Sequence, residues 1–317
     1  MPQYLLNRGN FRGPWAGLPV AWTANDEFDR ATFRNDVIRC CRAGIPGVYT
    51  GGTTGEFYAV EFEEFQQITE TVVEAAHECG TPAMIGVTAT CTRSAVRRAQ
   101  FAAAAGADAI QVALPFWMTV PDSQIVPFFR DVAAAAPELA FSVYETTRAK
   151  RVLTIAEHAA IREAVPQYVM VKSNAGTVGC SVEGCRALHE FVNVFVGEHL
   201  WPELGPAGAA GCCSACVYWN PRVILGAWES VEQQDWESLA QVGRKLQAQS
   251  KFLHETFGSR EFTDTAYDRL GSRATGFLQT SLNCRSPYPG VQPEDVELLR
   301  QWYRDHFPEM LDLPPAG

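Results

Sequence analysis

The chain has 317 residues, of which 47% are hydrophobic and 20% charged, a balance typical of a globular protein with a large core. Its net charge of −10 would repel a phosphate backbone or an anionic membrane surface, so nucleic-acid binding is not expected. No apolar run reaches the roughly 18 residues of a membrane span, and residues 1–11 lack the apolar core of a signal peptide. With ten cysteines, this pattern predicts a cytoplasmic protein with free thiols.

Short apolar segments alternate with helical patterns along the chain. Candidate strands end near Val20, Gly51, Gly86, Leu114, Tyr144, Lys172, Gly197 and Ser214. Segments such as AMIGV and YVMVK are apolar throughout, as in strands buried on both faces of a parallel sheet. Apolar residues at helical spacing predict helices over residues 57–79, 92–105, 122–136 and 155–164. The pattern favours an α/β fold, a closed (β/α)8 TIM barrel, over an open six-stranded sheet.

The signals change after Trp219, where strand patterns stop and several helices follow, with a break at residues 285–289. We therefore assign residues 1–218 to the barrel, with residues 1–13 as a lead-in. Residues 219–317 would form the last barrel helix and a C-terminal helical extension of the same structural unit. The tail, residues 313–317, is expected to fray.

Active sites of α/β barrels lie at the carboxyl ends of the strands, so polar residues there are candidates. Only four lysines stand against 22 arginines, and Lys172 is the one that ends an apolar strand. Desolvation there would favour a neutral amine, which can attack a ketone and form a Schiff base. The alternative is a strand-end lysine that reaches out to solvent.

Two further strand ends carry polar groups. The segment from Gly51 to Glu56 reads GGTTGE and is expected to open a helix, where backbone N–H groups and threonine hydroxyls suit an anion such as a carboxylate. The plainer alternative is a glycine-rich turn with Thr53 or Thr54 as a helix N-cap. Tyr144 ends another apolar run and could relay protons, or it could simply pack with its hydroxyl in water.

The cysteines offer a weaker signal. Cys213 and Cys216 form a C-x-x-C pair, but no second ligand pair has matching spacing, and a zinc site needs about four ligands. We expect no metal. These cysteines are better read as small buried residues between a strand and the next helix.

Taken in order, G-T-T-G-E, a strand-end tyrosine and a strand-end lysine resemble the dihydrodipicolinate synthase/N-acetylneuraminate lyase family of class I aldolases. The segments PAMIGVTA, AAAAGADAIQVALPFW and CRSPY add to the resemblance. It implies that Lys172 forms the Schiff base and that Tyr144 shuttles protons. It also implies that Gly52, Thr53 and Thr54 hold the pyruvate carboxylate, with Thr53 touching the Tyr144 hydroxyl. Members of the family are commonly tetramers built from dimers and need no metal or organic cofactor beyond the covalent Schiff base, so the resemblance implies that this chain is a dimer or tetramer.

Three positions depart from the synthase pattern. Trp117 stands near the place of a tyrosine that reaches a neighbouring subunit, and an indole cannot relay a proton as a phenol does. Glu145 follows Tyr144 where Asn is usual, and Arg148, a candidate for a distal carboxylate, comes one residue early. The run from Pro115 to Trp117 looks closer to hydratase-aldolases that split arylidene pyruvates.

The favoured function is therefore a class I aldolase or lyase that makes or breaks a C–C bond next to a pyruvate-type 2-oxo acid. The alternative is a Schiff-base dehydratase or deaminase of a 2-oxo sugar acid or a hydroxyproline catabolite. A third reading is a non-catalytic sensor of a small 2-oxo acid. Specificity would come from loops near residues 115–121, 145–151, 174–180 and 199–216, which include Trp117, Arg148 and Cys213.

Overall fold

The computed structural model describes residues 1–314, so the tail expected to fray falls largely on residues 315–317, outside the described part. Its strands follow one another around a closed barrel in chain order. They are β1 (Gly13–Gly17), β2 (Val48–Thr50), β3 (Ala83–Gly86), β4 (Ala109–Val112), β5 (Ala140–Glu145), β6 (Tyr168–Ser173), β7 (Asn193–Phe195) and β8 (Ala209–Ser214). The predicted (β/α)8 barrel is confirmed, and each strand ends within a few residues of its expected position.

Helices alternate with these strands and then continue alone beyond β8. They are α1 (Arg30–Arg42), α2 (Phe62–Glu78), α3 (Thr92–Ala104), α4 (Asp122–Ala134), α5 (Ile155–Ala164), α6 (Val182–His189), α7 (Trp201–Leu204), α8 (Cys216–Trp219), α9 (Pro221–Glu232), α10 (Trp236–Phe257), α11 (Asp264–Thr275) and α12 (Pro293–His306). The C-terminal helices are thus present as expected. Within residues 1–314, no helix is long and apolar enough to cross a membrane.

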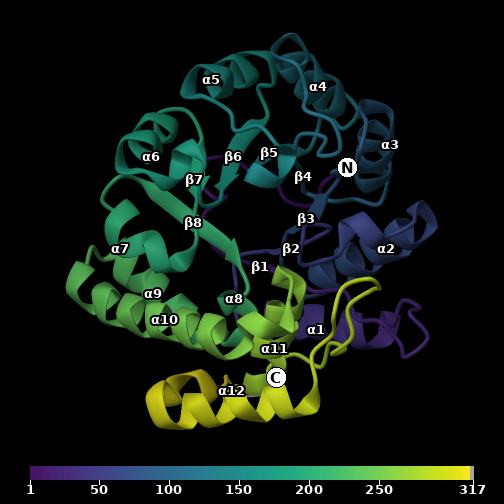
Figure 1. Cartoon of the computed structure of the whole chain (residues 1–317). Coiled ribbons are helices and arrows are strands. Elements are labelled where there is room, and N and C mark those ends of the chain that lie inside the picture. Colours follow the sequence, from purple (N-terminus) through teal and green to yellow (C-terminus); the bar gives the residue numbers. More distant parts are fainter. Residues whose placement is uncertain (315–317) are drawn as a thin grey trace. The chain divides into compact units, whose positions relative to one another are not determined.

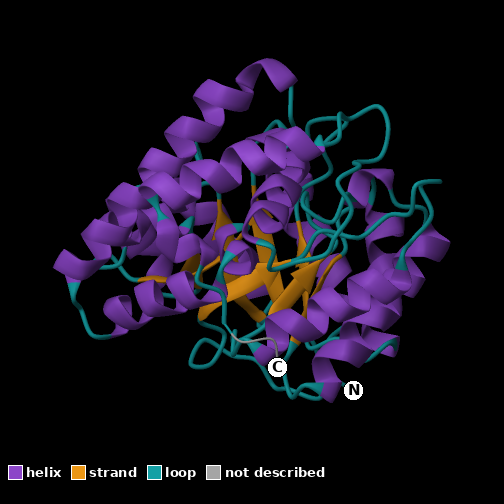
Figure 2. Cartoon of the chain, turned by 90° about the horizontal axis from the view of Figure 1, so that it is seen from below, coloured by secondary structure: helices purple, strands orange, loops and turns teal. Residues whose placement is uncertain are grey.

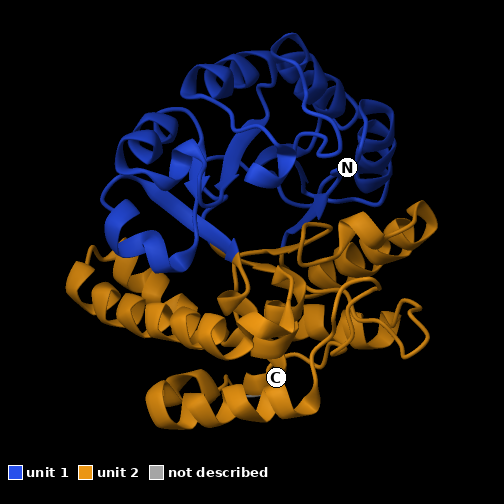
Figure 3. Ribbon diagram, in the orientation of Figure 1, with its two compact units in different colours: residues 1–13, 82–213 blue, residues 14–81, 214–317 orange. Residues whose placement is uncertain are grey.

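The chain divides into two compact units (Figure 3). Unit 1 comprises residues 1–13 and 82–213, and unit 2 comprises residues 14–81 and 214–317. In unit 1 the strands from β3 to β8 pair in parallel, each with the next. Helices α3 to α6 lie on the outer side of these strands (Figures 1 and 2). Unit 2 contributes the parallel pair β1 and β2 together with the C-terminal helices.

A bulge in β6 decides which side chains of this strand face the barrel interior. Phe141 pairs with Tyr168, but the next residue of β5, Ser142, pairs with Met170, so Val169 is an extra residue in β6. Such an insertion reverses the alternation of side chains along a strand. Below the bulge, the Tyr168 ring stacks on His158 of α5. Above it, the Met170 sulfur lies 3.2 Å from the Ser142 hydroxyl, among buried polar groups of the strand interior.

Candidate functional site

Lys172 and Tyr144 lie side by side near the carboxyl ends of β6 and β5. They are direct partners in the strand register, as are Ser142 and Met170 two residues earlier. Because successive side chains alternate, Lys172 and Tyr144 face the same side as that interior pair. The Lys172 Nζ lies 4.6 Å from the centroid of the Tyr144 ring. Tyr144 is buried and Lys172 is half-buried, so an amine and a phenol share a largely desolvated position.

Asn174 completes this arrangement and was not anticipated from the sequence. Its Nδ2 donates a hydrogen bond of 3.0 Å to the Tyr144 hydroxyl oxygen. Because the phenol oxygen accepts this hydrogen bond, the phenol proton remains available for a different acceptor. The signal that could have revealed Asn174 is its spacing of two from Lys172, which continues the same strand face.

Cys213, on β8, is the candidate that lies within electrostatic range of Lys172. Burial raises the pKa of its thiol to about 11, and the positive charge of Lys172 works in the opposite direction. A thiol with such a pKa stays protonated at neutral pH, so Cys213 is a small, weakly polar lining residue rather than a nucleophile. Within residues 1–314 no cluster of three or more His, Cys, Asp or Glu side chains is placed to hold a metal ion.

The loops after β4 and β5 meet through Lys150. Its Nζ donates to the Trp117 carbonyl oxygen at 2.6 Å and lies 5.6 Å from the centroid of the indole ring. Trp117 and Met118 are both 73% exposed, which is unusual for large apolar side chains. Arg148 lies in the same β5–α5 loop, within a short 3-10 turn, Thr147–Ala149, and is also exposed.

In unit 2, the Gly51–Glu56 segment forms a tight turn after β2, but it does not open the α-helix. A separate 3-10 turn, Phe57–Ala59, follows it, and α2 begins only at Phe62. Glu61 and Glu64 form the capping box of α2, so neither Thr53 nor Thr54 is the N-cap. The expected helix N-terminus beneath these threonines was therefore wrong, because two acidic residues further along satisfy the first N–H groups instead.

Backbone geometry explains the glycines of this turn. A Cβ atom on Gly52 would come within 2.4 Å of the Tyr49 hydroxyl, and Gly51 has a φ of +80°. The Thr53 carbonyl accepts from the Thr265 hydroxyl at 2.9 Å and from the Glu56 N–H at 3.0 Å. The turn is therefore fixed from within unit 2, as a preformed binding loop requires.

The last residue of the motif, Glu56, is an anchor. Its fully buried carboxylate accepts from Arg269 Nη2 at 2.6 Å, from Trp22 Nε1 at 2.5 Å and from the Arg285 N–H at 2.8 Å. Arg269, equally buried, also donates to Val20 and Ser281. A buried charge needs such pairing to be tolerated. Glu56 thus ties the threonine turn to the segment that follows β1, to α11 and to the segment between α11 and α12.

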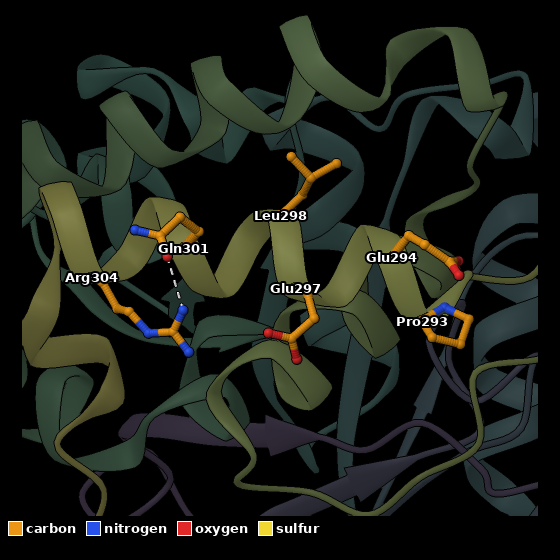
Figure 4. Close-up of a pocket in the computed structure, with 6 residues that line it drawn as sticks. All are labelled: Pro293, Glu294, Glu297, Leu298, Gln301 and Arg304. Atoms are coloured by element: carbon orange, nitrogen blue, oxygen red, sulfur yellow. Dashed lines mark hydrogen bonds between the residues drawn. The ribbon is translucent and has the colours of Figure 1, made fainter.

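A groove of about 540 Å³ runs along α12 (Figure 4). Its walls come from Pro293, Glu294, Glu297, Leu298, Gln301 and Arg304. These residues lie on one helix and include neither a candidate nucleophile nor a residue of the GGTTGE turn. We assign no catalytic role to this groove.

The fold is a closed parallel barrel with an amine and a phenol paired at its strand ends, and comparison with known proteins shows the family to which the chain belongs. The model of the dihydrodipicolinate synthetase family matches residues 10–295. The chain belongs to this family, as its motifs indicated. The relatives named below are lyases and aldolases, and the protein is an enzyme of the carbon–carbon lyase class.

Three similarities illustrate the range of this family. The chain is 29% identical to the trans-O-hydroxybenzylidenepyruvate hydratase-aldolase of Pseudomonas putida, covering 92% of this chain and 91% of that protein. It is 25% identical to the 4-hydroxy-tetrahydrodipicolinate synthase of Natronomonas pharaonis, covering 95% and 99%. A solved structure of a catalytic lysine mutant of Ruminococcus gnavus sialic acid aldolase superposes with a TM-score of 0.84 at 17% identity, covering 98% of this chain and all of that one.

Proposed function

We propose that the protein is a class I aldolase of the hydratase-aldolase type, in which Lys172 forms an imine with a pyruvate-type 2-oxo acid. The observation that carries this proposal is the pairing of the Lys172 amine with the Tyr144 phenol at 4.6 Å from its ring centroid. An amine in its neutral form adds to a carbonyl carbon, which is the first step of Schiff-base catalysis. The name of the Pseudomonas putida relative favours this branch over the synthase.

The proposed cycle balances without any cofactor. The Lys172 amine adds to the 2-oxo carbon, and the Tyr144 phenol gives its proton to the carbinolamine hydroxyl, which leaves as water, so that an iminium ion and a phenolate remain. With an arylidene substrate, water then adds across the carbon–carbon double bond, with its hydroxyl on the γ-carbon and its other hydrogen on the β-carbon. The Tyr144 phenolate takes the proton of the γ-hydroxyl, the bond between the β- and γ-carbons breaks, and an aldehyde leaves. The electron pair of that bond becomes the enamine, which the iminium accommodates. Protonation of the β-carbon and hydrolysis of the imine then release pyruvate and restore the lysine.

The remaining roles follow from the family resemblance. Gly52, Thr53 and Thr54 would receive the carboxylate of the 2-oxo acid through N–H and hydroxyl groups. Trp117 and Arg148 would receive the distal part of the substrate, and Cys213 would line the position of the imine. The rigid Glu56 anchor supports the first of these roles, because a preformed loop does not have to be ordered when a ligand binds.

Borohydride trapping tests the proposal directly. Incubation with pyruvate and borohydride should add one reduced pyruvyl group to a peptide that contains Lys172, and Lys172→Met should abolish it. Lys251→Met is the matched control, because Lys251 is exposed on α10 and forms an ion pair with Glu255 there, so trapping should be unchanged. Labelling at Lys150, or no labelling by any 2-oxo acid, would overturn the imine proposal.

Product analysis separates the possible reactions of this imine. With benzylidenepyruvate we expect benzaldehyde and pyruvate, whereas a dehydratase or deaminase would leave the carbon skeleton intact. A sensor would bind 2-oxo acids without gaining mass after reduction. We also propose a dimer or tetramer, which sedimentation of the purified protein measures independently of activity.

A further inference from the structure

Glu145 follows Tyr144 in β5, and its side chain points away from the proposed catalytic groups. It is 3% exposed and lies beside His158 of α5, with Oε2 and the imidazole Nε2 3.4 Å apart and not aligned for a hydrogen bond. The other ring nitrogen of His158 lies 2.8 Å from the Tyr168 hydroxyl oxygen. Burial raises the pKa of the Tyr168 phenol well above its ordinary value, and the Glu145 carboxylate adds to this effect. A carboxylate in so dry a place requires a specific reason.

The second oxygen of Glu145 supplies that reason. Oε1 accepts a hydrogen bond of 3.0 Å from the backbone N–H of Leu153. Glu145 is the last residue of β5, and Leu153 stands two residues before α5 begins. One buried side chain therefore joins the two ends of the loop 146–153. Hydrogen bonds between a carboxylate and an N–H are about twice as strong as neutral ones.

The loop that Glu145 closes reaches over to the neighbouring β4–α4 loop. Lys150, near its tip, has a φ of +59° and is fixed by its own N–H, which donates to the Thr147 carbonyl oxygen. From this position its Nζ holds the Trp117 carbonyl oxygen at 2.6 Å. Arg151 adds a second link, to Asp122 at the start of α4, at 2.6 Å. The exposed indole of Trp117 thus depends for its position on a loop that Glu145 clamps from below.

We infer that Glu145 is a positioning residue for substrate selection: its carboxylate clamps the 146–153 loop, which in turn holds Trp117 where the distal apolar group of a 2-oxo acid binds. This inference rests on the proposed function for the substrate, but the clamp itself is a property of the loop. Loss of the Glu145 carboxylate, which accepts from the Leu153 N–H, should therefore weaken binding of a substrate that carries a distal aromatic ring, and should leave imine formation with pyruvate intact.

The experiment compares Glu145→Ala and Glu145→Gln with the wild type in two measurements. One is the ligand concentration that gives half-maximal borohydride trapping, measured with pyruvate and with a phenyl analogue. The phenyl analogue is benzylidenepyruvate whose carbon–carbon double bond has been reduced, so that the enzyme cannot cleave it. The other is hydrogen exchange of peptides that span residues 146–154. In Glu145→Ala the value for the phenyl analogue should rise at least about tenfold, as expected when one charge-assisted hydrogen bond is lost. The value for pyruvate should change less than about twofold, and the loop should exchange at least about tenfold faster.

Glu145→Gln retains an oxygen acceptor for Leu153, so it should restore most of both properties. Glu138→Ala is the matched control, because Glu138 is exposed and lies before the other end of β5; it should change neither measurement. Equal losses with both ligands would mean that Glu145 serves only the general stability of the fold and would overturn the inference, as would an unchanged loop in Glu145→Ala. Absence of trapping in the wild type would refute the imine instead, and hydrogen exchange would then still decide whether Glu145 clamps the loop. If Glu145→Ala does not fold, Lys150→Met provides the test, because losing the hold on Trp117 should weaken the phenyl analogue alone.

Discussion

Replacing Tyr144 with Phe separates a catalytic phenol from a merely packed one. The substitution keeps the ring, which is buried at 5% exposure, and removes only the hydroxyl group. The structural loss includes the 3.0 Å hydrogen bond from Asn174 Nδ2 to the Tyr144 hydroxyl. A hydrogen bond of this kind contributes about 0.5–1.5 kcal/mol, so the fold should survive with a small fall in melting temperature.

The kinetic effect should be much larger than the effect on stability. A positioned acid–base group contributes about 10²–10⁴-fold to a rate. At about 1.36 kcal/mol per decade this corresponds to roughly 3–5 kcal/mol of the activation barrier. We therefore expect turnover of a cleavable aldol to fall at least about a hundredfold. Pyruvate trapping at Lys172 should persist at a lower rate, because water can partly replace the phenol when the carbinolamine loses water.

The assay needs turnover, trapping and melting temperature from the same preparation. Asn174→Ala is a useful companion, because it leaves the phenol and removes only its hydrogen-bond donor, so its turnover should lie between the wild type and Tyr144→Phe. A well-folded Tyr144→Phe variant with near-normal turnover would refute the reasoning and remove Tyr144 from the mechanism. A variant that lost trapping and turnover equally would place the phenol in imine formation instead.

Three further outcomes are expected. Burial raises the pKa of Asp36 from 3.8 to about 7, so between these pH values the folded chain retains a proton that the unfolded chain releases. The free energy of unfolding should therefore fall as pH rises from about 4 to 7. Asp36→Asn should remove this loss, so this variant should melt higher than the wild type at pH 8 but not at pH 4. Arg269→Met removes the buried partner of the Glu56 carboxylate and should cost about 3–5 kcal/mol in chemical denaturation, whereas a loss below about 1 kcal/mol would show that this ion pair does not stabilise the fold. With Trp117 in place of a phenol, a coupled assay with pyruvate and aspartate semialdehyde should show no dihydrodipicolinate synthase activity; robust turnover would contradict this reading of the loop.

The strands were predictable because buried parallel strands are apolar on both faces, and such segments stand out in a sequence. Lys172 and Tyr144 could be found as polar exceptions at the ends of these segments, and their pairing follows from the parallel register. The family could be predicted for the same reason, since its motifs fall at strand ends.

Other features depend on the three-dimensional contacts of single side chains. Nothing in the letters GGTTGE shows that α2 starts at Phe62, because the capping box that satisfies its first N–H groups comes from Glu61 and Glu64, outside this motif. Glu145 looked like a departure from a pattern, and only the position of the Leu153 N–H gives it a role. Asn174 needed the Tyr144 hydroxyl beside it before it could be recognised.

The extra residue in β6 has a consequence for how this barrel can change over generations. The apolar run before Lys172 tolerates many substitutions among Val, Ile and Leu, because each keeps volume and hydrophobicity. A deletion is different. Without Val169, the side chains of β6 would alternate between the two faces of the strand without interruption. With Tyr168 still against His158, Lys172 would then point toward the helices instead of the barrel interior. The direction of the lysine is therefore encoded in the length of the strand rather than in the identity of any residue. Loss of one codon would therefore turn Lys172 away from the proposed imine-forming position while leaving the composition of the chain almost unchanged.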